Sequence, residues 1–402
     1  MSEWRESRFL EIATVIMGQS PASEFYNSDG NGLPFMQGNR TFGERYPTID
    51  TYTTQATKIA PQNSILMSVR APVGDINIAP LEMCIGRGLC AINAKGSYNE
   101  FVRYLLSYNM PRLKSSENGT TFTAINGDDI KKLKILIPDL PTQKRIADIL
   151  SAYDDLIENN NRRIALLEKA AQELYKEWFV RFRFPGYENA KFENGLPEGW
   201  ERKKISVYYD TCSGGTPSRT HEEYFESGIY PWVKTGEIKD CIIIDTDEYI
   251  TEEAVKKSSA KLLPAKSVAM AMYGVNIGQL GYFDRQMTCN QACCVFSDKR
   301  SFSSKHYLFQ YLKSIREYLL LISFGAAQQN LSQELIKKIK IVMPSDYVVR
   351  AFEEKFDTIY DSIKTLMCKN QNLAKQRDLL LPRLMNGKLE VKKCYLQKRK
   401  LI

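Results

Sequence analysis

Histidine is scarce in this 402-residue chain, and the scarcity restricts the catalytic sites that the chain can form. The two histidines are His221, in a polar run that predicts a solvated turn, and His306, which opens a predicted helix. A Ser-His-Asp triad or an imidazole base would need one of them. The acidic pairs Asp128-Asp129 and Asp154-Asp155 fit a helix N-terminus and a long helix, respectively. We therefore expect no catalytic residue in this chain.

The chain also lacks the short motifs with which enzymes hold phosphates, target bases or zinc. It has no G-x-x-x-x-G-K-[ST] loop, no G-x-G-x-x-G and no CxxC pair. It has no Pro-Pro, which an amino-methyltransferase with an Asn/Asp-Pro-Pro-Tyr/Phe motif would need near the target base. These absences favour a binding protein without a cofactor or metal of its own.

Long apolar runs and a signal sequence are missing as well. The longest apolar stretch, 318–322, is far too short to span a bilayer, and the N-terminus has no apolar signal core. We expect a soluble cytoplasmic protein whose nine cysteines stay reduced. Cys289, Cys293 and Cys294 form a CxxxCC cluster that fits either a soft-metal site or buried thiols on a strand, and we favour the thiols.

What the chain does contain is an ordinary globular composition with a mild basic excess. Hydrophobic residues make up 43 % and charged residues 25 %, which excludes general disorder. The length suggests two or three domains. The formal charge of +8 permits an anionic partner without requiring one.

The sequence repeats itself after about half its length. Trp4 recurs 196 positions later as Trp200. The segment 119–138 matches 325–344 at a shift of 206, with Gly, Ile, Lys-Lys, Lys, Ile and Pro in register. This period is too long for a solenoid and indicates a duplicated domain. Each copy predicts an α/β globule with strands at 64–69 and 267–272, helices at 101–108 and 307–321, and final strands at 133–137 and 339–343.

Each copy ends in one long predicted helix. The first runs from about Thr142, a possible N-cap after Pro141, to Phe182, and the second from Ser345 to Met385, with Pro382 expected to bend or end its last turn. Apolar residues recur mainly every three or four positions, as in a coiled-coil seam. The seam residues are Ile146, Leu150, Tyr153, Ile157, Ile164, Leu167, Leu174 and Trp178 in the first helix, and Phe352, Phe356, Ile359, Ile363, Leu366, Leu373 and Leu380 in the second.

These features predict a mixed α/β protein with an internal pseudo-two-fold repeat. Two similar globules, 1–140 and 185–344, are separated by two long helices that form an antiparallel coiled coil. The helices lie in 141–184 and in 345–402, and the second range also includes a C-terminal tail. Asn160-Asn161 and Asn370 interrupt the seam and would set its register. Unlike globules on a helical spacer suit an asymmetric, bipartite DNA site with an unread spacer.

The residues resemble the specificity subunits of type I restriction–modification enzymes over essentially the whole chain. The resemblance rests on Leu140–Ile164, Leu174–Phe179, Gly195–Trp200, Gly325–Ser332 and Leu384–Leu389, whereas 350–364 departs from the family's pattern. It implies that each globule is a target recognition domain reading half of a bipartite site in double-stranded DNA. It also implies that the coiled coil sets the spacer and docks methylation subunits, two of them by our expectation. Those subunits would carry S-adenosylmethionine and the adenine chemistry, and restriction subunits could join them.

Polar residues in loops that flank the shared strands are the candidates for DNA contact, because Arg suits guanine edges and Asn or Gln suits adenine. They are Gln19, Ser20, Arg40, Arg70 and Arg87 in the first copy, and Ser218, Arg219, Lys234, Tyr273, Asn276, Arg285 and Gln291 in the second. Two lysine groups are candidates for a phosphate track or for solvated helix ends, namely Lys131, Lys132 and Lys134, and Lys337, Lys338 and Lys340.

Two other classes of function stay open at this point. One is a divergent methyltransferase or nuclease with an unrecognised site. The other is a protein-binding adaptor whose basic excess is incidental.

Overall fold

The computed structural model describes residues 4–115, 124–323 and 330–391. The repeat residues 119–123 and 325–329 and the ninth cysteine, Cys394, lie outside these ranges. The chain forms two compact units, the first built from 1–158 and 370–402 and the second from 159–369. Each unit contains one globule and parts of both long helices.

The globule of the first unit is built on an antiparallel sheet of order β2-β10-β7-β8. A second sheet, β3-β5-β4-β9-β6, and a β1-β11 pair complete it. The elements are β1 (Arg5–Arg8), α1 (Phe9–Ile12), β2 (Ala13–Met17), η1 (Ser23–Phe25), β3 (Tyr26–Asn27), β4 (Leu33–Met36), β5 (Tyr52–Thr53), β6 (Ile59–Ala60), β7 (Ile65–Ser68), β8 (Ile76–Ile78), β9 (Met83–Ile85), β10 (Leu89–Ala94), α2 (Asn99–Lys114), α3 (Gly127–Lys132) and β11 (Lys134–Ile137).

The central strands β7 and β10 are apolar on both faces, because each face packs against a different layer. Ile65 and Met67 belong to a core shared with α2 and the start of the long helix α4. Leu66, between them, points to a second core shared with the sheet of β4 and β9. This alternation with a period of two is that of a strand buried on both sides. The expected strand at 64–69 is therefore confirmed.

The globule of the second unit has the same strand order, β15-β22-β19-β20, extended by β17, and the same parallel pair, β16 with β21. The repeat is therefore confirmed in the topology. Its elements are β14 (Glu201–Lys204), α5 (Ile205–Tyr208), β15 (Tyr209–Ser213), η4 (Glu222–Tyr224), β16 (Tyr230–Val233), η5 (Thr235–Glu237), β17 (Cys241–Ile243), β18 (Tyr249–Ile250), α6 (Glu252–Lys257), β19 (Val268–Ala271), β20 (Leu280–Phe283), β21 (Thr288–Cys289), β22 (Cys293–Asp298), α7 (Lys305–Ser314), α8 (Arg316–Ser323), α9 (Gln333–Lys338) and β23 (Lys340–Met343).

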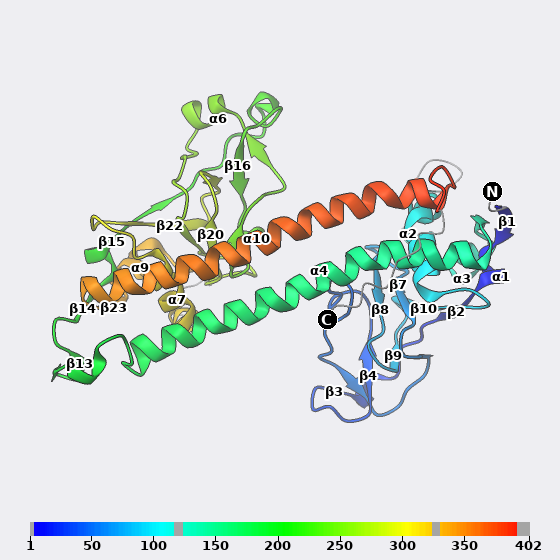
Figure 1. The fold of residues 1–402 in the computed structure, drawn as a ribbon, viewed down its shortest axis with the longest axis horizontal. Helices are drawn as coiled ribbons and strands as arrows, with labels where there is room; N and C mark the ends of the chain where they lie inside the picture. Colours follow the sequence, from blue (N-terminus) through cyan, green and yellow to red (C-terminus); the bar gives the residue numbers. More distant parts are fainter. Residues whose placement is uncertain (1–3, 116–123, 324–329, 392–402) are drawn as a thin grey trace, which may run out of the picture. The chain divides into compact units, whose positions relative to one another are not determined.

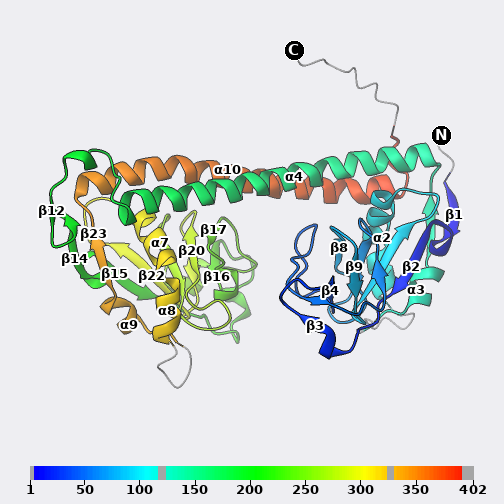
Figure 2. The ribbon, with the colours of Figure 1, turned by 90° about the horizontal axis from the view of Figure 1, so that it is seen from below.

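The two long helices are α4 (Leu140–Tyr175) and α10 (Asp346–Met385), each drawn as one continuous coil in Figure 1. A π-turn, η2 (Lys176–Val180), follows α4, and η3 (Tyr187–Asn189) and the hairpin β12 (Phe192–Glu193) with β13 (Leu196–Pro197) lead to β14. In the first unit the end of α10 shares a core with the start of α4, whereas in the second unit the end of α4 lies beside the start of α10 (Figure 2). The pairing is therefore antiparallel, as expected.

The seam residues bind the globules as well as the partner helix. Ile146 and Leu150 of α4 belong to the core of the first globule, together with Leu384 and Met385 of α10. In the second unit Phe352 stacks edge-on with Phe179, their ring centroids 4.8 Å apart, within the core of the second globule. The first turns of each long helix are therefore part of a globule as well as of the coiled coil.

Two expectations about the helices are wrong. Thr142 is not the N-cap of α4, because the helix begins at Leu140 and the carboxylate of Asp139 accepts the N–H of Thr142 at 3.1 Å. The helix expected at 307–321 is two helices, α7 and α8, which meet at Ile315. By contrast, α10 ends at Met385 as expected, with Pro382 inside its last turn.

None of the helices in the described part of the chain is long and apolar enough to cross a membrane.

Candidate nucleic-acid interface

In the first globule, the turn between β9 and β10 at residues 86–88 gathers the loop candidates. Gln19 donates its backbone N–H to the Ile85 carbonyl oxygen at 2.9 Å. Ser20 accepts the Arg87 N–H at 3.2 Å, and its hydroxyl donates to Gln37 Oε1 at 2.8 Å. Gly18 permits this approach, because a Cβ at that position would lie 2.2 Å from the Gly86 carbonyl oxygen. The order of these strands thus brings three separate loops to one sheet end.

The second globule repeats this arrangement with different side chains. A Cβ on Gly214 would lie 2.0 Å from the Cys289 carbonyl oxygen, so the same close approach occurs. The Thr216 hydroxyl donates to Gln291, and Lys234 follows Val233, whose carbonyl oxygen accepts the Asn290 N–H at 3.0 Å. The two globules therefore present different polar groups at the same place in the fold.

Four of the candidate cations form ion pairs with acids of their own globule. Arg40 lies 2.7 Å from Asp50, Lys234 lies 2.8 Å from Glu248, and Arg285 lies 3.4 Å from Asp245. Arg219 lies 2.6 Å from the other oxygen of Glu248. Hydrogen bonding to Lys234 and Arg219 outweighs partial burial and holds the pKa of Glu248 below its usual range. Sequence reasoning missed both the acids and Gln37, because nothing in their local sequence marks them.

Arg219 is held by stacking as well as by its ion pair. Its guanidinium carbon lies 4.2 Å from the ring centre of Phe225 and 5.2 Å from that of Trp232. The side chain is nevertheless 56 % exposed. A planar guanidinium fixed in this way presents its remaining N–H groups in a defined direction.

Arg70 and Arg87 differ from these residues, because neither forms an ion pair with another residue in the described part of the chain. Both are exposed, and Val69, next to Arg70, donates its N–H to the Gly88 carbonyl oxygen at 2.9 Å. The exposed lysines Lys132 and Lys134 follow at the end of α3, and Lys338 and Lys340 at the end of α9. Lys131 and Lys337 lie near acids of their own helices.

Two candidates in the second globule are placed differently from the others. The Asn276 amide donates to the carbonyl oxygens of Thr235, Gly236 and Ile238 at 3.0–3.3 Å, so it braces a loop. Arg285 follows β20 and therefore lies at the opposite sheet end from Tyr273. Ser218 and Thr220, which flank Arg219 in the chain, share a hydrogen bond.

The histidines and the cysteine cluster of the second unit are placed by packing and turn geometry. His306 is 1 % exposed, and its Nε2 lies 3.0 Å from Asp357, while burial lowers its pKa to about 4. Cys289, Cys293 and Cys294 are fully buried on β21 and β22, which confirms thiols on strands. His221 is exposed and contacts Glu223, as expected for a turn. Across the described ranges, no group of three or more His, Cys, Asp or Glu side chains could hold a metal.

Apolar side chains remain exposed on the long helices. Leu156 and Leu379 are 51 % and 66 % exposed in the first unit, and Leu166 is 67 % exposed in the second. The segment 350–364, which departs from the family's pattern, places Phe352, Phe356, Tyr360 and Ile363 in the core of the second globule. Its sequence therefore follows the packing needs of that globule.

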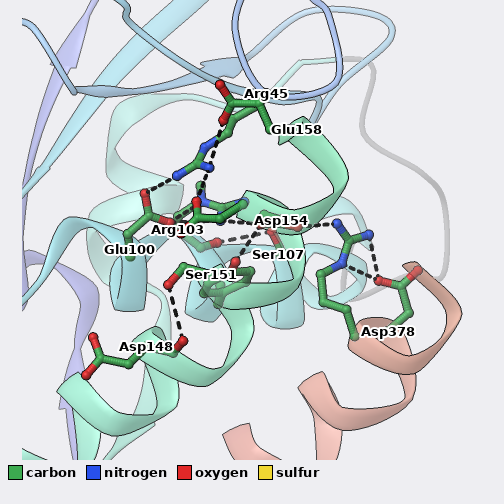
Figure 3. Close-up of polar contacts among 12 residues, drawn as sticks. Arg45, Glu100, Arg103, Ser107, Asp148, Ser151, Asp154, Glu158 and Asp378 are labelled. Carbon is green, nitrogen blue, oxygen red and sulfur yellow. Dashed lines mark hydrogen bonds and ion pairs between the residues drawn. The ribbon is translucent and has the colours of Figure 1, made fainter. Parts of the chain in front are cut away.

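Sequence reasoning also missed the role of Asp154, because the sequence indicates only that this residue lies on a long helix. Asp154 is 8 % exposed and accepts hydrogen bonds from Arg103 and Arg377 at 2.6 and 2.5 Å (Figure 3). Tyr104 donates to it as well, at 2.5 Å. Its neighbour Asp155 lies 2.6 Å from Arg45. These contacts join the globule of the first unit to both helices.

Comparison with known proteins agrees with this architecture. The family model of the type I restriction modification DNA specificity domain matches residues 1–169 and 197–372, one copy in each half. The specificity subunit of the type I restriction enzyme MjaIX of Methanocaldococcus jannaschii is 27 % identical, covering 97 % of this chain and 94 % of the relative. The HindI specificity subunit of Haemophilus influenzae is 26 % identical over 69 % of this chain and 73 % of the relative.

A solved structure shows the same fold. The crystal structure of a type I restriction-modification S subunit from M. genitalium matches with a TM-score of 0.58 at 16 % identity, covering 97 % of both chains. The family model spans most of this chain in two copies, and the repeat and the paired helices follow the same plan. The chain therefore belongs to the DNA-specificity subunits of type I restriction–modification enzymes, which select the sequence and leave catalysis to other subunits.

Proposed function

We propose that each globule reads one half of an asymmetric bipartite site in double-stranded DNA and that the helix pair sets the spacer. The observation that carries this proposal is the repeated sheet end, which presents Gln19, Gln37 and Arg87 in one copy and Thr216 and Gln291 in the other. Two globules that share a fold but present different polar side chains are suited to two half-sites of different sequence.

Within the first globule, Arg70 and Arg87 are our candidates for direct DNA contact. An exposed arginine without an internal acid partner is available to a guanine edge or a phosphate. Arg40, by contrast, would first have to give up Asp50.

Within the second globule, Arg219 is our candidate for reading guanine. Glu248 and the two aromatic rings hold its guanidinium, so little conformational entropy remains to be lost when it binds. Glu248 could accept from a cytosine N4 amino group beside it.

We also propose that two methylation subunits dock on the long helices and that these subunits, not this chain, bind S-adenosylmethionine. The exposed Leu156, Leu166 and Leu379 support this placement, because exposed apolar side chains on helices suit protein partners. A restriction subunit could join such an assembly, and its site of action would be the cytoplasm, where the DNA lies.

Methylation mapping of cells with and without this gene tests the proposal. Loss of one bipartite N6-methyladenine motif on deletion is expected, and an unchanged methylation pattern would contradict the proposal. Replacing residues 1–140 with the corresponding domain of another specificity subunit should change one half of the motif only. A change in both halves would show that the globules do not read independently.

Two further assays separate the rival functions. A methyltransferase would transfer methyl groups as the isolated chain with S-adenosylmethionine, which we do not expect. A protein adaptor would assemble with its partner but bind all duplexes with equal affinity. The assembled methyltransferase should instead prefer duplexes that contain its motif, and its affinity for DNA should fall steeply as the salt concentration rises.

A further inference from the structure

Four residues in the first unit meet at the buried carboxylate of Asp154, and we call them the Asp154 cluster: Arg103 and Tyr104 of α2, Asp154 of α4 and Arg377 of α10. One Asp154 oxygen, Oδ2, accepts from Arg103 and Tyr104, and the other, Oδ1, accepts from Arg377. One carboxylate thereby joins the globule to both long helices.

A second arginine of the globule, Arg45, also pairs with α4 beside the cluster. Arg45 reaches α4 through Asp155 at 2.6 Å and Glu158 at 3.1 Å, and approaches Glu100 of α2 at 3.5 Å (Figure 3). Arg45 itself is only 17 % exposed. Charged side chains rarely become this buried unless they are paired.

Electrostatics keep Asp154 ionised. Burial acts to raise its pKa, but the charge of Arg103 and the hydrogen bonds from Tyr104 and Arg377 outweigh burial and lower the pKa below its usual range. The carboxylate is thus a fixed acceptor for donors that come from two other helices.

The second unit has no such cluster at the corresponding place. The helices α4 and α10 begin at Leu140 and Asp346, so equivalent positions differ by 206. The corresponding residues are Phe309 for Arg103, Tyr360 for Asp154 and Ala171 for Arg377. The ring centroid of Tyr282 lies 6.0 Å from that of Phe309 and 4.9 Å from that of Tyr360. These three rings and Ala171 line a cavity of about 40 Å³.

The positions equivalent to the Asp154 cluster are therefore aromatic or apolar, and the polar contacts of the second globule with α10 lie elsewhere, at Glu353 and Asp357. Aromatic packing is broad and non-directional. A carboxylate that accepts hydrogen bonds from two guanidinium groups fixes the orientation of the helices that carry them. The reason is that a planar guanidinium donates well only within a narrow range of angles.

We propose that Asp154 is a positioning residue, which fixes the orientation of the first globule on the helix pair and thereby restricts recognition to one spacing between the half-sites. This inference rests on the proposed function. Asp154 need not contact DNA, because it acts through Arg103, Tyr104 and Arg377.

Selection from random duplexes tests the inference, and it does not require the motif to be identified beforehand. The assembled methyltransferase containing the full chain is incubated with a library of random duplexes, and the retained DNA is sequenced. The wild-type chain should return two half-motifs at one spacer length. Asp154→Asn should return the same half-motifs, with a several-fold larger share of duplexes whose spacer is one base pair longer or shorter.

Matched variants keep the result interpretable. Arg377→Gln should broaden the spacer in the same way, because it removes the same contact from the α10 side. Asp148→Asn makes the same chemical change at an exposed ion pair on α4 and should leave a single spacer. Hydrogen exchange of β7 and β10 should remain slow in every variant, which shows that the globule is folded.

The outcomes separate the two levels of the argument. A single unchanged spacer for both folded variants, Asp154→Asn and Arg377→Gln, overturns the positioning role. Failure of the wild-type assembly to return any motif overturns the proposed function itself. Loss of the first half-motif in these folded variants would also contradict a positioning role, because it would mean that Asp154 supports reading and not spacing.

Discussion

Arg377 of α10 lies 2.5 Å from Asp154 of α4, although 223 residues separate them in the chain. Asp154 in turn accepts from Arg103 of the first globule at 2.6 Å. One buried carboxylate thus ties three helices together in the first unit. The second unit has Phe309, Tyr360 and Ala171 at the equivalent positions, so a duplicated fold does not imply duplicated chemistry.

Arg87 and Arg70 should matter more for DNA binding than Arg40. Replacing either residue with alanine should weaken binding of the assembled complex by about 1–3 kcal/mol if it contacts a base, and relax specificity at one position. A phosphate contact would instead weaken binding to all sequences and reduce the salt slope by about one. Titration of motif and random duplexes at several salt concentrations distinguishes the two. If Arg40→Ala reduced DNA affinity as much as Arg70→Ala or Arg87→Ala, the absence of an acid partner would not mark the residues that contact DNA.

Glu248 should act on DNA reading through Arg219. Glu248→Gln removes the charge that holds both Arg219 and Lys234, so we expect specificity in the second half-site to fall. Selection from random duplexes should show a less defined second half-motif and an unchanged first one. Glu252→Gln is the matched control, because Glu252 forms an ion pair with Lys256 on the surface of α6. Two unchanged half-motifs for Glu248→Gln would contradict the assignment.

Glu353 should make the stability of the second unit depend on pH. It is buried and accepts the N–H groups of His306 and Tyr307, and burial raises its pKa to about 7. A carboxyl whose pKa is higher in the folded state binds more protons there, so its contribution to stability is full below its unfolded pKa and is lost as pH rises toward 7.

The variant Glu353→Gln isolates this effect, because it removes the titrating group, keeps one carbonyl oxygen that can accept the N–H of Tyr307, and leaves the His306 side chain unchanged. Relative to this variant, the wild-type chain should lose on the order of 3 kcal/mol of unfolding free energy between pH 4.5 and pH 7. Denaturant unfolding of both chains across this range measures the difference. A constant difference would show that Glu353 has an ordinary pKa.

Trp178 should be a major support of the second unit. It is 5 % exposed, and its ring centre lies 5.7 Å from that of Phe352. Trp178→Ala should reduce unfolding free energy by about 3–5 kcal/mol. Leu166→Ala, at a site 67 % exposed on α4, the helix that precedes the turn with Trp178, should change stability by less than about 0.5 kcal/mol but weaken assembly with methylation subunits. Thermal unfolding and co-purification measure the two effects, and equal destabilisation by both variants would contradict this division.

The sequence by itself determined the duplicated plan of the protein. A shift of 206 residues relates α2 to α7, α3 to α9 and α4 to α10 at their first residues. Period-two and period-3.6 patterns are local, so strands such as β7 and helices such as α4 follow directly from residue spacing. The absence of catalytic motifs and the long helical seams then pointed to a binding subunit.

Only the tertiary structure decided which charged side chains are engaged with one another. Asp50, Glu248 and Asp154 carry no local signal, yet each binds an arginine brought close by the fold. Ion pairing depends on distances between segments far apart in the chain, and those distances follow from strand order and helix packing, not from neighbouring residues. For this reason the sequence named Arg40 and Arg87 as equals, and the structure distinguished the paired residue from the unpaired one.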